Sequence, residues 1–245
     1  KKTALDIVYE DKDVIFINKP AGMLSQKAKD SDESLVEYLI DYLLGSGQLS
    51  REELKSFRPS VCNRLDRNTS GLVAAGKSLL GLQVLSKAIK ERTIGKYYLC
   101  IVKGVIDSPR RIQGWLLKNE KTNQVTVTKQ RREGSLPIET EYVPMASDGH
   151  YTLLKVKLIT GRSHQIRAHL ASIGHPIIGD TKYGDPRENL AAKKKYGVSC
   201  QLLHAALLVL PEELPEELSR LRGMEVSAPL PDVFAAFAGQ LQGGR

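Results

Sequence analysis

The chain has 245 residues and a mass of 27.1 kDa, which is enough for one large domain or two small ones. Hydrophobic residues make up 41% and charged residues 26%, ordinary values that exclude a disordered, fibrous or collagen-like chain. No apolar run approaches the ~20 residues that a membrane span needs, and we find no charged-then-apolar leader. Three scattered cysteines without a C-x-x-C pair indicate neither a disulfide framework nor a zinc site, so we expect a cytoplasmic protein.

The net charge of +8 is concentrated in the middle of the chain. Residues 51–210 contain 27 Lys and Arg against 13 Asp and Glu, whereas residues 1–50 and 211–245 are each acidic. A basic segment between acidic flanks favours binding to a polyanion, because each neutralised phosphate releases counterions. A Lys-rich solubilising surface would give the same counts, so charge alone leaves both interpretations open.

Hydrophobic spacing predicts the elements of the first half of the chain. Residues 14–17 are expected to form a strand that enters a turn, and residues 34–44 an amphipathic helix that stops at Gly45. Residues 45–60 are expected to form a loop. The pattern then predicts two short strands, a helix and a longer strand, over residues 61–65, 71–76, 78–91 and 96–102.

Alternation with a period of two dominates the next part of the chain. It predicts strands joined as hairpins over Ile112–Leu117, Gln124–Thr128 and Tyr151–Ile159. A helix is then expected over 163–173, a polar Lys-rich loop over 180–199 and a strand over 202–210. Two small helical pieces are expected to finish the chain. We find no internal repeat and no long linker, so we predict a single domain, residues 1–245, of the α+β class with a mixed, mostly antiparallel sheet.

Arg64 and Arg67 bracket Asp66 in the densest polar stretch of the sequence, residues 63–71. Nearby cations favour the ionised form of a carboxyl group, and a carboxylate that stays charged is a candidate nucleophile or electrostatic stabiliser. The alternative is an ion-pair cluster that holds a loop in place. Taken alone, this stretch favours that alternative, because structural Arg–Asp pairs are commoner than catalytic ones.

Residues 71–78 match the P-loop pattern G-x-x-x-x-G-K-[ST]. A P-loop needs a buried apolar strand before its first glycine and a loop of backbone N–H groups around the phosphates. Here the residues before Gly71 are polar, and the four spacer residues Leu72–Ala75 read as the strand itself. A nucleotide-binding P-loop protein is therefore a disfavoured alternative.

A second dense polar stretch, residues 160–170, contains two histidines and two arginines. The five-residue offset from His164 to His169 separates them by roughly 140° on a helix, and no carboxylate lies between them, so the pair is a poor metal site. A buried stripe through Ile166 leaves Arg167 on the flank, where it can reach an anionic group or a carboxylate. The alternative is a helix whose arginines are solvated.

Tyr97 and Tyr98 are adjacent at the start of the strand expected over 96–102. Neighbouring strand residues face opposite sides, so one ring can lie in the core while the other stacks on a base or a sugar. Tyrosine in a strand more often serves packing alone.

Taken in order, these stretches closely resemble the RluA-type pseudouridine synthases. The matching segments are Ile15–Met23, Asn63–Gly71, Lys96–Tyr98, Gly161–His169, Gly174–Gly184 and Leu202–Ala205. The resemblance therefore extends from residue 15 to residue 205, essentially a whole catalytic domain. It implies the pseudouridine synthase catalytic fold, in which a bisected sheet with flanking helices surrounds a central cleft.

The resemblance implies that Asp66 is the nucleophile that detaches uracil from its ribose and rejoins it through C5. Tyr97 would stack beside the flipped uridine, Arg167 would pair with the catalytic carboxylate, and Leu203 would pack the pocket floor. Arg64 would help to hold the RNA or fill the space that the base leaves. Other candidates for contact with substrate are Asn63, Arg67, Thr69, Arg162, His164 and Gln165. No cofactor or metal is implied.

The sequence departs from the family at Asn63, where relatives more often have His, so the role of that imidazole is not carried over. Many relatives also have a small S4-type RNA-binding domain ahead of the catalytic domain, and we expect none in this chain, because its first predicted strand lies close to Lys1.

We therefore expect an enzyme that isomerises uridine in structured RNA, most simply 23S ribosomal RNA, by base flipping. Attack at C1′, attack at C6 and a glycal route all remain open. The alternatives are the same reaction on transfer RNA and a non-catalytic RNA-binding module. RNA is the expected partner, with no membrane and no metal, and we expect a monomer.

Overall fold

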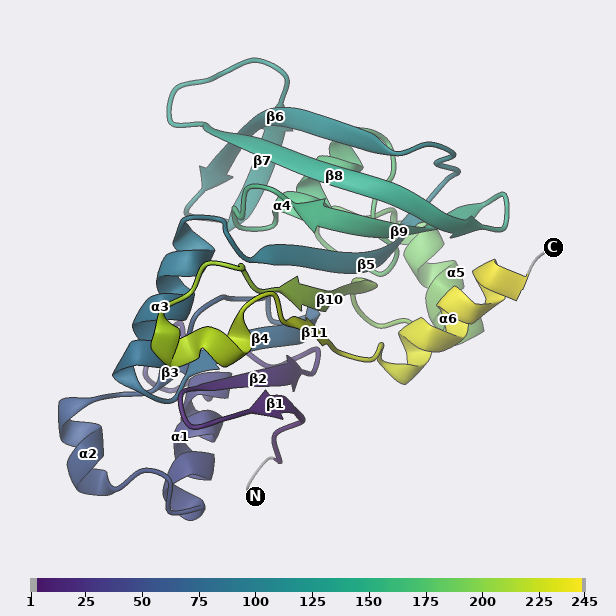
Figure 1. Cartoon of the computed structure of the whole chain (residues 1–245). Coiled ribbons are helices and arrows are strands. Elements are labelled where there is room, and N and C mark those ends of the chain that lie inside the picture. The colour runs from purple at the N-terminus through teal and green to yellow at the C-terminus, as the bar shows by residue number, and fades with distance from the viewer. Residues whose placement is uncertain (1–3, 244–245) are drawn as a thin grey trace. The chain divides into compact units, whose positions relative to one another are not determined.

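The computed structural model describes residues 4–243, which form a mixed, mostly antiparallel sheet with flanking helices (Figure 1). Contacts divide the chain into two compact units. The first unit comprises residues 1–95 and 205–229, and the second comprises residues 96–204 and 230–245.

The first unit contains a small sheet covered by helices. Its strands are β1 (Ile7–Glu10), β2 (Val14–Lys19), β3 (Ser60–Val61), β4 (Ser70–Gly76), β11 (Glu225–Ser227) and most of β10 (Leu203–Val209). Its helices are α1 (Leu35–Gly45), α2 (Arg51–Ser56), α3 (Leu79–Lys90) and the 3₁₀ helix η1 (Glu216–Leu221). β2 lies between β1 and β4 and pairs antiparallel with both, and β11 pairs antiparallel with β10.

The fully buried strand β4 forms the centre of the first unit. Leu72 and Ala74 join Phe16 of β2 and Leu85 of α3 in one hydrophobic cluster. At Gly71 a side chain would overlap the backbone of Ala205 in β10, and φ there is +116°, a conformation that favours glycine. The chain therefore needs glycine where β4 follows the polar loop.

The second unit is built on five antiparallel strands in the order β5, β9, β8, β6, β7. Their bounds are β5 (Gly95–Lys103), β6 (Arg110–Asn119), β7 (Gln124–Thr128), β8 (Leu136–Ser147) and β9 (Tyr151–Leu158). The helices are α4 (Gln165–Ser172), α5 (Pro186–Tyr196) and α6 (Asp232–Gly243). Ala168 of α4 packs with Ile138 of β8, whereas Phe234 and Phe237 of α6 pack in a separate cluster with Ile101 of β5.

The helices predicted at 34–44, 78–91 and 163–173 are confirmed in type and approximate position, and so are the predicted strands except the one at 61–65. There β3 ends at Val61, and residues 62–65 belong to no strand. Two loop predictions are wrong, because residues 45–60 contain α2 and residues 180–199 contain α5. Capping accounts for both helices. Ser50 forms a capping box with Glu53, and α5 begins with Asp185 as N-cap followed by Pro186 and ends at Gly197 in the left-handed conformation. None of the helices in residues 4–243 is both long and apolar enough to cross a membrane.

Candidate active site

Asp66 lies on the loop between β3 and β4 in the first unit, and both of its neighbours are held by hydrogen bonds. The Leu65 amide donates to Ser25 Oγ, and Ser25 Oγ donates to the Leu65 carbonyl, each at 3.0 Å. On the other side, the Gly22 amide donates to the Arg67 carbonyl at 2.8 Å. The backbone of Asp66 is therefore fixed on both sides by the segment that follows β2.

Lys19 connects the same two segments from inside the protein. Its side chain is fully buried, and Nζ donates to the carbonyls of Pro20 at 2.9 Å, Met23 at 2.8 Å and Arg67 at 3.0 Å. A buried ammonium group needs such acceptors, because it has lost its hydration. Lys19 therefore ties the turn after β2 to the loop that carries Asp66.

The side chains of this loop divide into inward and outward sets. Leu65 and Thr69 are buried, Asp66 is half-buried, and Arg64 and Arg67 are exposed. A carboxylate lies between two exposed guanidinium groups in the sequence, on a backbone that is fixed. The loop therefore holds a half-buried carboxyl group between two exposed cations.

Asn63 supports strand β4. Its side chain is buried, Nδ2 donates to the Leu72 carbonyl at 3.2 Å, and Oδ1 accepts from the Ala74 amide at 2.7 Å. An amide side chain suits this position because it donates and accepts at the same time. Contact between Asn63 and RNA stays a prediction.

The P-loop alternative does not fit the structure. Gly71 and Gly76 lie within the buried strand β4, and no loop separates them. Lys77, which would bind phosphate in a P-loop, instead donates from Nζ to Glu10 Oε1 at 2.6 Å and to the Asp11 carbonyl at 2.7 Å. The sequence-based argument against a P-loop is confirmed.

Arg167 lies on α4 in the second unit and is 7% exposed. It donates two hydrogen bonds to Asp180, from Nε to Oδ2 at 2.7 Å and from an Nη to Oδ1 at 3.1 Å. Its guanidinium lies 5.2 Å from the centre of the Tyr183 ring. Burial raises the pKa of the Asp180 carboxyl, but the hydrogen bonds and charge of Arg167 outweigh burial and hold that pKa below its ordinary value. The direction of the guanidinium is thus set from within the second unit.

Gln165 fixes the start of α4. Its Oε1 accepts from Thr160 Oγ1 at 2.8 Å and from the Arg162 amide at 3.1 Å, and its Nε2 donates to the Glu139 carbonyl and to Thr140 Oγ1, both at 3.0 Å. The side chain is 2% exposed. Direct contact between Gln165 and RNA stays a prediction, and its observed contacts join α4 to β8.

The two histidines of the stretch 160–170 have different environments. His164 precedes the helix in the left-handed conformation, with φ of 55°, and its Nδ1 lies 2.7 Å from Tyr183 Oη. His169 is buried against Thr140, and burial lowers its pKa to about 4. Within residues 4–243, no three His, Cys, Asp or Glu side chains form a group that could hold a metal ion.

The strand register places Tyr97 and Tyr98 on opposite faces of the sheet. Tyr98 stands opposite Val156 of β9, and Val156 stands opposite Tyr142 of β8, so these side chains share a face. Thr140, two residues before Tyr142, bonds to α4 through His169 and Gln165, which identifies this face as the one that α4 covers. Tyr98, 7% exposed, is therefore on the α4 face, and Tyr97 is on the other.

The remaining predicted residues are Arg162, which is exposed just before α4, and Leu203, which is buried at the start of β10. The candidates divide between the units: Asn63, Arg64, Asp66, Arg67 and Thr69 lie in the first, and Tyr97, Arg162, His164, Gln165, Arg167 and Leu203 in the second. Sequence reasoning missed Ser25, Lys19 and Asp180. The one available signal was Lys19 itself, a lysine at the end of a strand that begins with four apolar residues.

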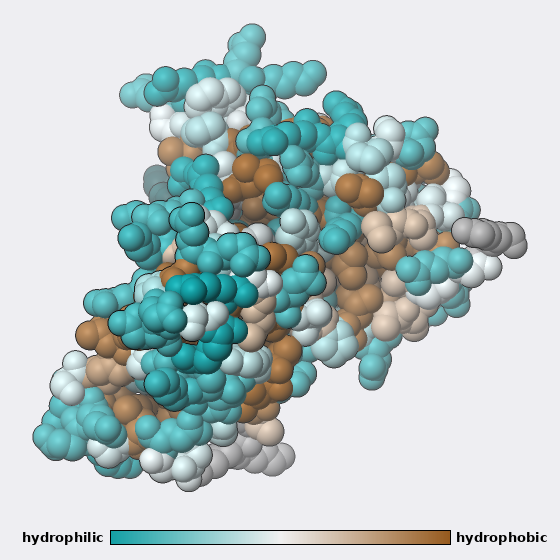
Figure 2. Space-filling model, in the orientation of Figure 1, coloured by the Kyte–Doolittle hydropathy of each residue, from teal (hydrophilic) through white to brown (hydrophobic). Residues whose placement is uncertain are grey.

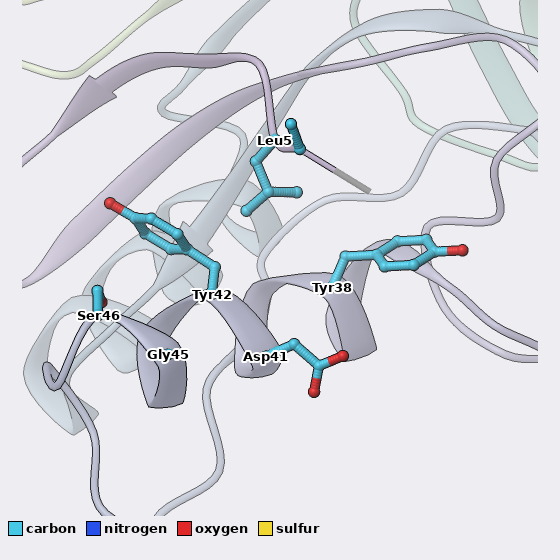
Figure 3. Close-up of a pocket in the computed structure, with 7 residues that line it drawn as sticks. Leu5, Tyr38, Asp41, Tyr42, Gly45 and Ser46 are labelled. Atoms are coloured by element: carbon cyan, nitrogen blue, oxygen red, sulfur yellow. The ribbon is translucent and has the colours of Figure 1, made fainter. Parts of the chain in front are cut away.

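A pocket of about 360 Å³ lies elsewhere in the first unit, between α1 and the segment before β1 (Figure 3). Leu5, Tyr38, Asp41 and Tyr42 line it, and none of the predicted site residues does. Tyr42 Oη donates to Glu10 Oε2 at 2.7 Å, so one wall is fixed by a contact to β1.

Comparison with known proteins gives a consistent result. A model of the RNA pseudouridylate synthase family matches residues 13–172. The chain is 36% identical over 181 residues to ribosomal large subunit pseudouridine synthase D of Borreliella burgdorferi, which covers 73% of this chain and 54% of the relative. It is 30% identical over 230 residues to synthase C of Vibrio cholerae, covering 91% of this chain and 65% of the relative. The chain thus spans between half and two thirds of the length of these two relatives.

Solved structures show the same fold. The human RNA pseudouridylate synthase domain containing 4 superimposes with a TM-score of 0.76, covering 96% of this chain and 92% of the human one at 22% identity. The human RNA pseudouridylate synthase domain containing 1 gives a TM-score of 0.63, also at 22% identity, and covers 99% of this chain and 96% of the human one.

Proposed function

Because the chain belongs to the RNA pseudouridylate synthase family, as an RluA-type member, we propose that it converts uridine to pseudouridine in RNA. In this reaction the N1–C1′ bond breaks, a C5–C1′ bond forms, C5 loses its proton and N1 gains one. The observation that carries the proposal is the fixed loop around Asp66, whose neighbours Leu65 and Arg67 are both held by hydrogen bonds. A nucleophile on a fixed backbone is held in position before the substrate binds.

Asp66 is the proposed nucleophile. Its carboxylate attacks C1′ or C6, or assists a glycal route, and each of these requires the ionised form. The target nucleotide is flipped out of its helix, which costs a few kcal/mol that contacts in the pocket offset. Arg64 and Arg67, exposed on the same loop, are the proposed contacts to the RNA phosphates and to the space that the base leaves.

Arg167 is the proposed partner of Asp66. A guanidinium group has five N–H donors, and two of them serve Asp180. A guanidinium group that pairs with a carboxylate also orients it, and this is the role we propose for Arg167 toward Asp66.

The tyrosine beside the flipped uridine is better assigned to Tyr98 than to Tyr97. A residue that acts with Arg167 must lie on the α4 face of the sheet, and the register gives that face to Tyr98. Leu203 is proposed to pack the pocket floor, with Thr69, Arg162 and His164 near the RNA. We propose no catalytic metal or cofactor.

Ribosomal RNA is the proposed substrate, because the similar proteins from Borreliella burgdorferi and Vibrio cholerae are named for the large ribosomal subunit. Transfer RNA is the alternative. A monomer acting in the cytoplasm fits a polymeric RNA substrate, which needs no symmetric partner.

Tritium release from RNA labelled at uracil C5 tests the proposal, because the label leaves only when C5 becomes the glycosidic atom. We expect release by the wild type, none by Asp66→Ala, and normal release by the control Asp107→Ala, which removes an exposed carboxylate. Testing ribosomal and transfer RNA separately identifies the substrate class. If the wild type bound RNA but released no label from either, the chain would be an RNA-binding module and the proposed reaction would be excluded.

A further inference from the structure

The face of the second unit's sheet that lies opposite α4 has one part without a covering helix. Tyr97 of β5, Lys157 of β9, Glu141 of β8 and Arg111 of β6 stand opposite one another in adjacent strands, so they form one row across this face. Helix α6 covers only the other end, where its aromatic residues pack with Ile101. In Figure 1, α4 lies behind these strands.

The row is accessible to solvent and mixed in character. Arg111 is exposed, Tyr97 and Lys157 are half-buried, and Val143, which stands opposite Lys155, is 44% exposed. Figure 2 shows that the side of the strands toward the viewer carries hydrophilic residues with isolated hydrophobic ones between them. Such a surface lacks the continuous apolar core of a stable protein–protein interface.

Two aromatic rings on this face each have cations beside them. Lys155 Nζ and Lys157 Nζ lie 5.0 and 5.8 Å from the centre of the Tyr97 ring. Trp115 is four residues along β6 from Arg111, on the same face, and the Arg131 guanidinium lies 5.7 Å from its ring. These contacts repeat one chemistry, an aromatic ring with a cation at its side, at two places on one sheet.

The acidic groups of the face are already paired. Glu139 and Glu141 both bind Arg111, at 2.5 and 3.1 Å. Among the described residues, Lys155, Lys157 and Arg131 form no ion pair with a carboxylate. The cations beside the rings therefore remain available to an anion.

We propose that this surface, which we call the Tyr97 face (Tyr97, Trp115, Arg131, Lys155 and Lys157), binds a single-stranded segment of the RNA outside the modified nucleotide. Aromatic rings stack on bases of any sequence, and lysine and arginine beside them contact the phosphates. The row spans three strand spacings of ~4.8 Å, about 14 Å, which accommodates several nucleotides. The inference rests on the proposed function only for its choice of RNA as substrate.

The test measures binding of a fluorescein-labelled 20-nucleotide oligouridine by anisotropy at several salt concentrations. The variant is Lys155→Gln with Lys157→Gln, and the matched control is Lys193→Gln with Lys194→Gln, which removes the same charge from exposed positions on α5. We expect Kd to rise about tenfold for the first pair, with a salt slope shallower by about 1.4 if each lysine neutralises one phosphate. Trp115→Ala is expected to raise Kd about tenfold through lost stacking. The salt slope of the Lys193/Lys194 control variant is expected to be steeper than that of the Lys155/Lys157 variant.

Three outcomes separate this proposal from the proposed reaction. Wild-type Kd and salt slope in the Lys155/Lys157 variant would overturn the Tyr97 face, whatever the enzyme activity. Loss of binding in that variant, together with tritium release at saturating RNA that equals the wild type, would support a surface that binds substrate without taking part in the chemistry. A wild-type protein that binds the oligouridine through this face and releases no tritium from any RNA would overturn the reaction alone.

Discussion

The hydroxyl group of Ser25 forms two hydrogen bonds with a single residue, accepting from the Leu65 amide and donating to the Leu65 carbonyl, each at 3.0 Å. Ser25 and Leu65 are both buried, and Leu65 immediately precedes Asp66. One side chain thus satisfies both backbone polar groups at the start of the loop that we assign to catalysis.

Replacing Ser25 with Ala is expected to destabilise the protein by about 1–3 kcal/mol, because it leaves a buried amide and a buried carbonyl without a partner. The same change is expected to lower kcat more than it raises KM, since it loosens the backbone of the proposed nucleophile, Asp66. Urea denaturation and tritium release measure the two effects. Ser56→Ala, on the exposed helix α2, is the control and is expected to change neither. Equal stability in the Ser25 and Ser56 variants would show that the double hydrogen bond contributes nothing.

Breaking the buried pair between Arg167 and Asp180 is expected to cost about 3–5 kcal/mol in Asp180→Leu, because the guanidinium then stays buried without its carboxylate. The double variant Arg167→Met with Asp180→Leu is expected to be less destabilised than the single one, since it removes both charges. Chemical denaturation of the two variants measures this difference. Strictly additive losses in the double-mutant cycle would contradict a coupled pair.

The acid stability of the first unit is expected to depend on Asp11. Burial raises the pKa of its carboxyl, but hydrogen bonds from Arg220 and from the Asp13 and Val14 amides lower it to about 2, against an ordinary value of 3.8. A carboxyl with a lowered folded-state pKa contributes its full stability above pH 3.8 and loses it as the pH falls towards 2. Melting temperatures between pH 6 and pH 2 should therefore converge for wild type and Asp11→Asn, and Asp41→Asn serves as an exposed control. A gap that stayed constant with pH would contradict this assignment.

Replacing Tyr98 and Tyr97 with Ala is expected to change different kinetic constants. Tyr98→Ala should lower kcat by about 10-fold to 100-fold, because a stacked base loses about 1–3 kcal/mol. Tyr97→Ala should mainly raise KM, since its ring lies on the face opposite α4. Steady-state kinetics of both variants on one RNA distinguish them. The reverse pattern would return the active-site assignment to Tyr97.

Local patterns in the sequence predicted most of the fold because the core elements have clear hydrophobic periods. Leu35, Leu39 and Leu43 mark α1, and the buried run Leu72–Ala75 marks β4. Helix α2 has no buried residue, so no apolar stripe predicts it. Its capping box is the signal that indicates a helix there. Helix α5 has only one buried residue, Ala192, and its ends are marked by Asp185 and Gly197.

The candidate site was predictable in residue type more than in arrangement. The two-residue period of a strand shows that Tyr97 and Tyr98 face opposite ways, but only the register with β8 and β9 shows which one faces α4. Likewise, the sequence predicts that Arg167 can pair with a carboxylate, but it does not show which one. Asp180, thirteen residues away, is brought to Arg167 by the turn after α4. Register and loop closure depend on the whole chain, and a local window does not contain them.

The amide of Asn63 also determines how strand β4 responds to acidity. It bridges the Leu72 carbonyl and the Ala74 amide with one donor and one acceptor. A neutral imidazole could offer the same two functions, but it gains a proton near pH 6.5 and then has donors only. With Asn63 this support keeps the same form across the physiological range, so the acid limb of any rate profile reports on other groups.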